Sequence, residues 1–384
     1  MQHRVYGRLG YEVSALGMGC MRLPRIYHEQ GSAEVDREKA VELIRGAVDQ
    51  GVTYFDSAFT YHHKTSEEIL GMALEGGYRK KVKIATKQPF GAMKTQDQIR
   101  RNLESTLKKL RTDHLDVYLI HNIQEGMWDE IKRRRIIEEY ERFRDEGMIG
   151  AIGFSYHGKF PAFREILEYY PWDMCQVQQN LLDVDKEVTD QAIRLAGEKG
   201  AALVIMEPLR GGGLATPTPA VKRLYDSFPV RRSAAEWAFR HLLDYPQVSC
   251  ILSGMTTLEQ LQQNVEIFSR PDAVAGCISR EERALLTKVK TAYESVQSIP
   301  CTACEYCLPC PQGVDIPGIF DQYNEGMMFE NFSQPQRGYM FIQKAKASAD
   351  YCVECGACEK KCPQHIDIAA QLKKADHALS GWIE

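Results

Sequence analysis

The sequence contains no apolar run long enough to span a bilayer, and its N-terminus, MQHRVYGRLG, lacks the apolar core of a signal peptide. An excess of one charge is also missing, because 48 Lys and Arg residues stand against 52 Asp and Glu residues. This balance gives no electrostatic basis for binding nucleic acid or an anionic membrane. We therefore expect a cytoplasmic protein with neither partner, in a reducing compartment where disulfides are rare.

A Gly-rich GxGxxG turn after the first apolar run is absent too, which disfavours a doubly wound dinucleotide-binding sheet. Short apolar runs instead alternate with amphipathic helical segments. Eight such runs end in a polar or small residue, at residues 15–19, 52–56, 82–87, 115–121, 149–155, 174–178, 201–207 and 248–253. Eight strand–helix units predict an α/β fold, a (β/α)8 TIM barrel.

The two ends of the predicted barrel have their own signals. Residues 4–6 and 12–14 flank Gly7-Arg8-Leu9-Gly10 and predict a hairpin that plugs the barrel floor. A helix around residues 281–295 closes the large domain, and Ile299-Pro300 marks a boundary. We expect a barrel domain over residues 1–295 and a smaller domain over residues 296–384.

Cysteine is concentrated in the smaller domain, where eight of the twelve cysteines form two runs that are each followed by proline. This spacing is typical of ligands to iron–sulfur clusters, whereas zinc motifs usually separate two pairs by a dozen or more residues. Two zinc sites are the alternative. The candidate metal ligands are Cys301, Cys304, Cys307 and Cys310 in the first run and Cys352, Cys355, Cys358 and Cys362 in the second.

Three successive apolar runs of the predicted barrel end in Asp56, Lys87 and His121, and Tyr61 follows in the loop after the first of them. Active sites of such barrels lie at the C-terminal ends of the strands. A tyrosine hydroxyl could protonate a carbonyl oxygen that accepts hydride if a nearby ammonium lowers its pKa. Lys87 would supply that charge, Asp56 would hold Lys87, and His121 would orient the carbonyl.

Motifs around these four residues resemble, in order, the signature of the aldo-keto reductases. They are residues 51–58 (GVTYFDSA), Tyr61, residues 66–71 (SEEILG), residues 85–87 (ATK) and residues 116–122 (DVYLIHN). The resemblance covers about residues 3–270. It implies a barrel that binds NAD(P)H across its mouth, with Tyr61 as the proton donor and Asp56, Lys87 and His121 completing a catalytic tetrad.

The same resemblance implies cofactor contacts, with three departures from the family pattern. Tyr156 stands in place of an Asn, and Met206 in place of an aromatic residue that stacks on nicotinamide. Gly254 and Gln260 lack the positive charges of members that prefer NADPH, which slightly favours NADH. The implied cofactor-binding residues are Gly19, Ser155, Gln176, Met206, Pro208, Leu209, Arg210, Ser253, Gln260 and Asn264.

The C-terminal domain resembles helical dicluster ferredoxins, in which the fourth cysteine of each run ligates the other cluster. This implies one [4Fe–4S] cluster on Cys301, Cys304, Cys307 and Cys362, and a second on Cys352, Cys355, Cys358 and Cys310.

As a whole, the chain resembles aldo-keto reductases that carry such a domain. We expect an NAD(P)H-dependent oxidoreductase that reduces a small aldehyde or ketone to an alcohol. The alternative is an iron–sulfur electron-transfer or redox-sensing protein that uses the barrel as a nicotinamide-binding module. In either case a redox protein is a possible partner.

Overall fold

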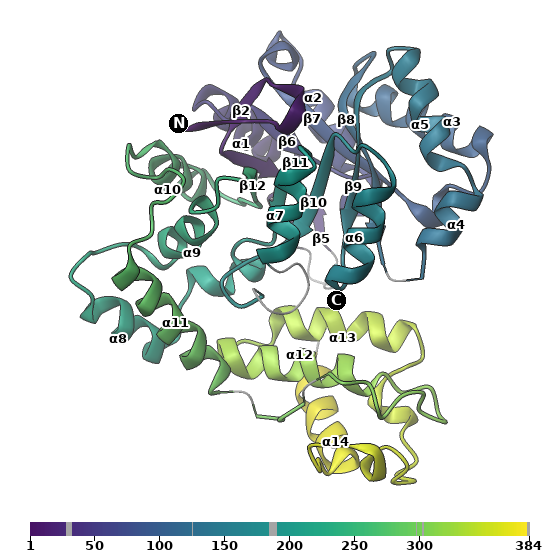
Figure 1. The fold of residues 1–384 in the computed structure, drawn as a ribbon, viewed down its shortest axis with the longest axis vertical. Helices are drawn as coiled ribbons and strands as arrows, with labels where there is room; N and C mark the ends of the chain where they lie inside the picture. Colours follow the sequence, from purple (N-terminus) through teal and green to yellow (C-terminus); the bar gives the residue numbers. More distant parts are fainter. Residues whose placement is uncertain (28–32, 125, 184–189, 297, 302, 382–384) are drawn as a thin grey trace. The chain divides into compact units, whose positions relative to one another are not determined.

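The computed structural model describes residues 1–27, 33–124, 126–183, 190–296, 298–301 and 303–381. Eight parallel strands close into a barrel in the order β10-β11-β12-β3-β6-β7-β8-β9 (Figure 1). The predicted barrel is therefore confirmed. Its strands are β3 (Leu16–Gly19), β6 (Tyr54–Asp56), β7 (Lys83–Pro89), β8 (Leu115–Ile123), β9 (Ile149–Tyr156), β10 (Met174–Gln178), β11 (Ala202–Met206) and β12 (Val248–Ser253).

Helices follow these strands along the chain and bury their apolar faces. In α3 the residues Ile99, Leu103, Leu107 and Leu110 are buried, as their spacing predicts, and the Thr95 side chain caps the first turn. None of the described helices has the length and apolar content needed to cross a membrane. The helices of this part are α1 (Arg37–Asp49), α2 (Ser66–Ala73), α3 (Gln96–Leu110), α4 (Trp128–Arg133), α5 (Ile136–Asp145), α6 (Phe160–Tyr169), α7 (Asp190–Glu198), α9 (Ala234–Leu243) and α10 (Leu258–Ser269).

A hairpin closes one end of the barrel, as predicted. Its strands β1 (His3–Val5) and β2 (Glu12–Ser14) pair antiparallel, and Tyr6 and Val13 are fully buried among side chains that fill the barrel interior. The hydroxyls of Tyr6 and Tyr54 lie 2.9 Å apart in a hydrogen bond. A second short hairpin, β4 (Arg25–Tyr27) with β5 (Ala33–Val35), pairs outside the barrel. The floor is thus sealed, and the opposite end remains for chemistry.

Two strands extend two residues beyond their predicted ends. β7 continues to Pro89, which pairs with His121 of β8, and β8 continues to Ile123, which pairs with Tyr156 of β9. Lys87 and His121 therefore lie two residues before the ends of their strands. Both still belong to the C-terminal part of the strands, where active sites of this fold are built.

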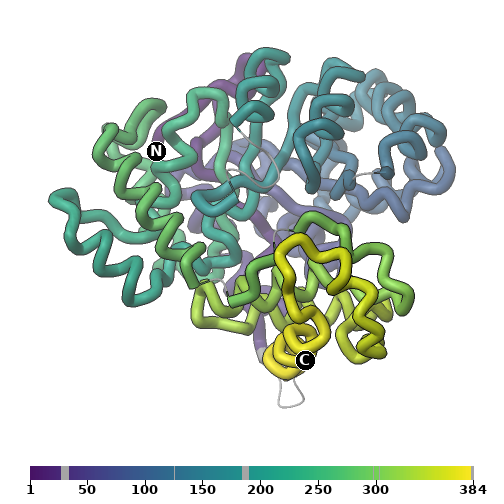
Figure 2. The backbone as a smooth tube through the Cα atoms, turned by 60° about the horizontal axis from the view of Figure 1, so that its bottom comes forward, coloured from purple at the N-terminus to yellow at the C-terminus, as the bar shows by residue number. Residues whose placement is uncertain are grey.

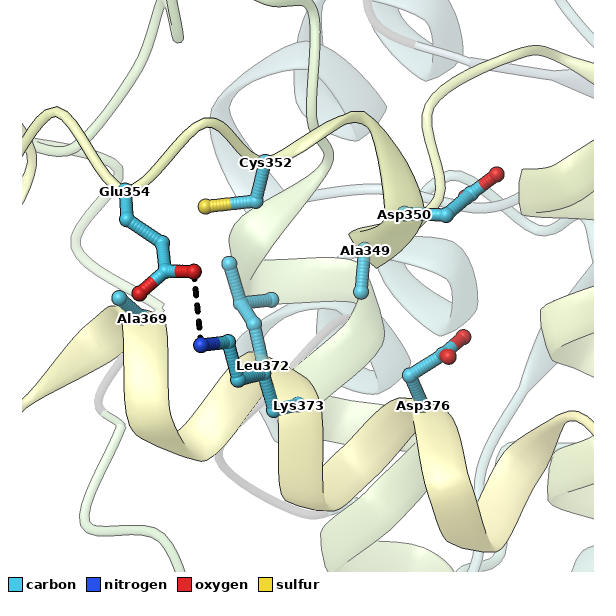
Figure 3. A pocket seen from close by; sticks show the side chains of 8 residues that line it. All are labelled: Ala349, Asp350, Cys352, Glu354, Ala369, Leu372, Lys373 and Asp376. Atoms are coloured by element: carbon cyan, nitrogen blue, oxygen red, sulfur yellow. Dashed lines mark ion pairs between the residues drawn. The ribbon is translucent and has the colours of Figure 1, made fainter.

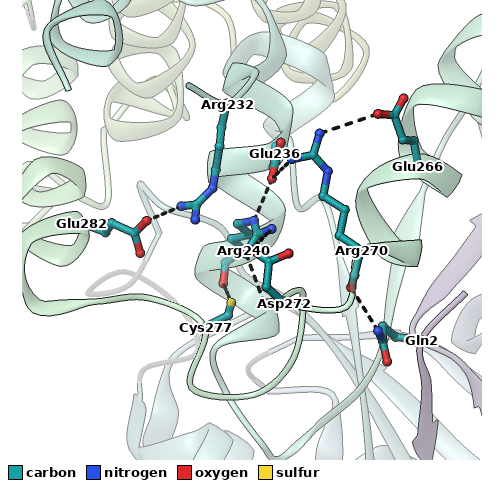
Figure 4. Close-up of polar contacts among 9 residues, drawn as sticks. All are labelled: Gln2, Arg232, Glu236, Arg240, Glu266, Arg270, Asp272, Cys277 and Glu282. Carbon is teal, nitrogen blue, oxygen red and sulfur yellow. Dashed lines mark hydrogen bonds and ion pairs between the residues drawn. The ribbon is translucent and has the colours of Figure 1, made fainter. Parts of the chain in front are cut away.

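A buried ion-pair network anchors α9, the helix that precedes β12 in the chain. Arg240 has only 1% of its side chain exposed, and its guanidinium lies 2.8 Å from a carboxylate oxygen of Glu236 and 2.8 Å from one of Asp272 (Figure 4). Arg270 pairs with Glu236 as well, at 3.2 Å. Because a buried guanidinium is stable only when it is paired, this network ties α9 to the segment after α10.

The chain divides into two compact units, and neither is one continuous segment. The barrel unit comprises residues 1–210 and 235–279, and the second unit comprises residues 211–234 and 280–384. The C-terminal helices, yellow-green to yellow in Figure 2, pack on one another. Helices of the second unit are α8 (Pro219–Ser227), α11 (Arg280–Glu294), α12 (Ile316–Phe329), α13 (Ser333–Lys344) and α14 (Ile368–Leu379). The domain boundary at residues 295 and 296 stays a prediction.

Two helices of the second unit begin just after Asp residues whose side chains cap them. The Asp315 side chain accepts a hydrogen bond from the Gly318 amide before α12, and Asp367 accepts one from the Ala370 amide before α14. Apolar side chains of these helices, including Phe320 of α12, form the core of the unit. Six of the eight clustered cysteines pack against this core.

Candidate functional site

Lys87 is the centre of the predicted tetrad. Its side chain extends from β7 and is 1% exposed, and its ammonium donates to the Asp56 carboxylate at 2.6 Å. The same Nζ donates to the Ser57 carbonyl at 2.7 Å and to the Tyr61 hydroxyl at 3.4 Å. All three ammonium protons therefore have acceptors, which fixes the direction of the charge toward the phenol.

The ion pair keeps Lys87 charged despite its burial. Burial opposes the charged form of an amine, but the electrostatic and hydrogen-bond interactions of the ammonium with Asp56 and Tyr61 outweigh it, so the pKa of Lys87 is raised. Burial raises the pKa of Asp56, and Lys87 offsets part of that rise. The site thus holds an ammonium beside a phenol at neutral pH.

The expected direction of the Tyr61 shift is wrong. Burial raises the pKa of Tyr61, and Lys87 lowers it only in part, so the net shift is upward. The reason is that a phenolate loses hydration in the barrel mouth, an effect that depends on packing. The Tyr61 hydroxyl consequently stays protonated, and Lys87 acts by stabilising the phenolate once the proton has left.

His121 completes the group. Its ring lies 5.9 Å from the Tyr61 ring, edge to face. Burial, together with the charge of Lys87 and the neighbouring His157, lowers the pKa of His121 to about 3. The imidazole is therefore neutral at physiological pH and carries one N–H that can donate a hydrogen bond. The structure brings all four predicted tetrad residues together.

A strained turn follows Tyr61. His62, His63 and Lys64 all have positive φ angles, of 49°, 52° and 74°, a conformation that non-glycine residues rarely adopt. The carbonyl of His62 accepts hydrogen bonds from the amide and hydroxyl of Thr65. The imidazole ring of His62 accepts a hydrogen bond from the Leu23 amide. Such strain persists only where surrounding contacts impose it, and here it lies beside the candidate proton donor.

We expect His63→Gly to stabilise the barrel unit. Glycine adopts positive φ without a steric penalty, which stabilises the folded state. This gain exceeds the loss from the greater entropy of glycine in the unfolded chain, so the free energy of unfolding should rise by about 0.5–1 kcal/mol. Denaturant titration measures the gain, and Glu42→Gly on the exposed face of α1 is the control, expected to lose about 1 kcal/mol. Equal losses in both variants would show that the turn stores no strain.

Gln176 carries an open acceptor at the barrel mouth. Its Oε1 is buried and has no hydrogen-bond partner among the described residues. Its Nε2 lies 3.6 Å from the sulfur of Met206, and its side chain lowers the pKa of Asp56. A buried amide oxygen without a partner is costly unless a ligand supplies a donor. Gln176 and Met206 thus fit a group that carries an amide, such as nicotinamide.

The side chains of Ser155 and Tyr156 lie in different surroundings. The Ser155 hydroxyl accepts a hydrogen bond from the Asn122 amide at 2.7 Å, and Asn122 has a φ of 56°. Tyr156 is fully buried, and its hydroxyl donates to the Lys159 carbonyl at 2.9 Å. Its side chain is therefore committed to packing next to α6, where it contacts Phe163.

Four further implied cofactor-binding residues lie on or next to β3, β12 and α10. Asn264 donates to the Ser253 hydroxyl at 3.0 Å, and both side chains are buried. The Gln260 side chain accepts from the Thr256 amide at 2.7 Å and so belongs to the first turn of α10. Gly19 pairs with Asp56 between β3 and β6, next to the Ser253 carbonyl.

Arg210 is held in a buried ion pair. Its guanidinium lies 2.7 Å from Asp183, whose carboxylate also accepts from the amides of Gln178 and Asn180. Pro208 is buried, and Leu209 packs against the barrel core. Asp183 therefore holds the Arg210 guanidinium in place. The sequence motifs do not single out Asp183.

Arg22 and Glu207 are further mouth residues that the sequence reasoning missed. They pair at 3.4 Å, and the Arg22 side chain covers Gly254, where an added Cβ would lie 3.1 Å from Cδ of Arg22. The Arg22 carbonyl also accepts from the Thr256 hydroxyl. The available signals were that Glu207 is the last residue of one predicted strand and that Arg22 follows another.

In the second unit, four of the clustered cysteines line one cavity. They are the fourth cysteine of the first run and the first three of the second run: Cys310, Cys352, Cys355 and Cys358. This is the set that the crossed arrangement predicts for the second cluster. Four thiols converging on one cavity fit the ligand chemistry of a [4Fe–4S] cluster.

The other set is also brought together. Burial raises the pKa of Cys301, and the nearby thiols of Cys304 and Cys362 raise it further. Burial raises the pKa of Cys307 to about 11, with smaller contributions from Cys301, Cys358 and Cys304. Among the described residues, no group of three or more His, Cys, Asp or Glu side chains has the arrangement of a site for a single metal ion.

Two sequence-family models match the chain. The model of the aldo/keto reductase family matches residues 15–274, and the model of the 4Fe-4S dicluster domain matches residues 300–366. The first match spans the barrel strands and all four tetrad residues, and the second contains both cysteine runs.

Individual relatives agree with the first match. A probable aldo-keto reductase 1 from Glycine max is 28% identical over 214 residues, which cover 54% of this chain and 59% of that protein. The holo form of the aldo-keto reductase AKR11C1 from Bacillus halodurans is 25% identical, with a TM-score of 0.63 over 75% of this chain and 96% of that one. A thermostable aldo-keto reductase, Tm1743, in complex with the inhibitor epalrestat is 27% identical, with a TM-score of 0.62 over 75% of this chain and all of that one.

Proposed function

The chain belongs to the aldo/keto reductase family, and on that premise we propose that it reduces an aldehyde or ketone to an alcohol with NAD(P)H. The observation that carries the proposal is the contact of the buried Lys87 ammonium with Asp56 and with the Tyr61 hydroxyl. The match to a dicluster domain adds an iron–sulfur module to this oxidoreductase.

In the proposed reaction, bound NAD(P)H supplies the hydride. The Tyr61 hydroxyl gives its proton to the carbonyl oxygen, and the Lys87 ammonium stabilises the phenolate that remains. The neutral His121 donates its N–H to the same oxygen and orients it. Tyr61 then recovers a proton from solvent, and the product is the alcohol.

We propose that Gln176 and Ser155 hold the carboxamide end of the cofactor, with Gln176 Oε1 accepting from the amide. Met206 would pack on its ring, and the segment of Pro208, Leu209 and Arg210 would lie along it. Gly19, Ser253, Gln260 and Asn264 would line the rest of its path. NADH is the preferred form, because Gly254 and Gln260 carry no charge and the Arg22 guanidinium is paired with Glu207.

Anaerobic turnover tests the proposal. The full-length protein is mixed with NADH or NADPH and a panel of aldehydes and ketones, while iron and sulfide are quantified. We expect cofactor oxidation that depends on a carbonyl and is faster with NADH. If NADH instead reduced the clusters without any carbonyl, and no carbonyl were turned over, the electron-transfer alternative would replace the reductase.

Activity should not respond to the charge of His121 between pH 5 and pH 7. An ordinary histidine becomes protonated near pH 6.5, whereas a pKa of about 3 keeps His121 neutral throughout this range. The acid limb of kcat/KM should therefore fall below pH 5. NMR titration of the His121 ring measures its pKa directly, and a midpoint near 6.5 would contradict the expectation.

We further propose that the two clusters are ligated in the crossed arrangement, by Cys301, Cys304, Cys307 and Cys362 and by Cys352, Cys355, Cys358 and Cys310. The thiols that converge on one cavity support it. Since thiolates must stay reduced to bind iron, a reducing compartment such as the cytoplasm suits the protein.

A further inference from the structure

The second unit contains a cavity that the proposed reaction does not use. It has a volume of about 220 Å³ and lies between α14 and the segment that leads into the second cysteine run (Figure 3). Its lining residues are Ala349, Asp350, Cys352, Glu354, Ala369, Leu372, Lys373 and Asp376. A single water needs only about 10–15 Å³, so a long side chain can enter.

This cavity adjoins the cavity of the second cluster. The two share Cys352, Glu354, Ala369 and Leu372, so a candidate cluster ligand stands in the wall between them. A group that enters from outside would therefore be separated from the cluster by little more than the Cys352 side chain.

The lining has an excess of negative charge. The lining residues carry three carboxylates, of Asp350, Glu354 and Asp376, and one ammonium, of Lys373, which is paired with Glu354 at 2.7 Å. Asp376 accepts bonds from the hydroxyls of Tyr339 and Ser380, and Asp350 accepts one from Ser348. Hydroxyl donors do not neutralise a carboxylate, and among the described residues neither Asp350 nor Asp376 forms an ion pair. The cavity thus attracts a cation.

Apolar side chains flank Cys352 on the surface. Tyr351 is 41% exposed and Val353 is 61% exposed, although both are large and apolar. Exposed aromatic and aliphatic residues next to charged ones are typical of protein–protein interfaces. A small charged ligand would gain nothing from Tyr351 and Val353, whereas a protein partner would cover them.

We propose that this surface docks the positively charged face of a one-electron redox protein, with a Lys or Arg side chain of the partner entering between Asp350 and Asp376. One electron then passes through Cys352: the cluster that it ligates is oxidised by one electron, and the partner's redox group is reduced by one. No bond forms or breaks. The inference rests on the proposed ligation of the second cluster.

Stopped-flow oxidation of the reduced, full-length protein by ferricytochrome c, a basic haem protein, tests the inference. We expect a rate constant that falls as salt is added. Asp350→Lys should lower the low-salt rate about tenfold and flatten the salt dependence, because steering charge is lost. Glu354→Gln, which leaves Lys373 unpaired, should act in the same direction.

Glu330→Lys is the matched control, since Glu330 is exposed at the end of α12 and does not line the cavity. Its rate should remain within about twofold of the wild type. An acidic flavodoxin, used as the opposite probe, should react more slowly at low salt than at high salt. If Glu330→Lys slowed cytochrome c as much as Asp350→Lys, net charge alone would explain the rates and the docking surface would be rejected.

Iron, sulfide and electron paramagnetic resonance spectra are recorded for every variant. A wild-type protein without a second cluster would overturn the ligation and the docking surface together. Two intact clusters with rates indifferent to Asp350 would overturn the docking surface alone.

Discussion

Tyr61→Phe is expected to lose carbonyl reduction by about 10²–10⁴-fold in kcat, because no other hydroxyl contacts the Lys87 ammonium among the described residues. The ring remains, so its packing near His121 should persist. Single-turnover kinetics with NADH and a substrate found in the screen measures the loss. Calorimetric titration should show that NADH still binds, which separates a missing proton donor from a damaged site.

Tyr78→Phe is the control for that experiment. Tyr78 lies on the surface of the same unit and donates to Asp49 at 3.0 Å, away from the barrel mouth. It should retain full turnover. If Tyr61→Phe kept more than half of the wild-type kcat, Tyr61 would not be the acid, and the reductase mechanism would have to be abandoned.

Two double variants should separate the crossed ligand sets from consecutive ones. In the crossed arrangement, Cys304→Ala with Cys362→Ala removes ligands from one cluster only, so the other cluster and about four iron atoms remain. Cys304→Ala with Cys310→Ala removes a ligand from each cluster, so iron should fall close to zero. Consecutive ligation predicts the reverse for both pairs.

Iron and sulfide analysis after anaerobic purification reads out this comparison. Cys277→Ala is the control, because Cys277 lies in the barrel unit and should leave both clusters in place. Equal iron in the two double variants would contradict the exclusive assignment of Cys310 and Cys362 to opposite clusters.

The fold and the tetrad could be predicted because their signals are local. Each strand is a short apolar run, and parallel strands bring their C-terminal ends to one rim, so Asp56, Lys87 and His121 could be placed together without coordinates. The cysteine runs were equally readable, since their spacing alone limits the ligand chemistry.

Other features depend on tertiary packing and could not be predicted. The upward shift of the Tyr61 pKa results from lost hydration, which the surrounding side chains determine. Arg22 and Glu207 are 185 residues apart in the sequence, and only the closed barrel brings them together. The strain at His63 is also hidden, because nothing in its residue type announces a positive φ.

The path of the chain has a consequence for anyone who wishes to dissect the protein. It crosses from one compact unit to the other after residues 210, 234 and 279. α8 packs on α11, and Phe329 of α12 lies against Gly213. A truncation that ends at residue 279 would strip the excursion over residues 211–234 of the helices that bury it. The iron-binding module is therefore interwoven with the reductase rather than appended to it, and no single cut releases either one whole.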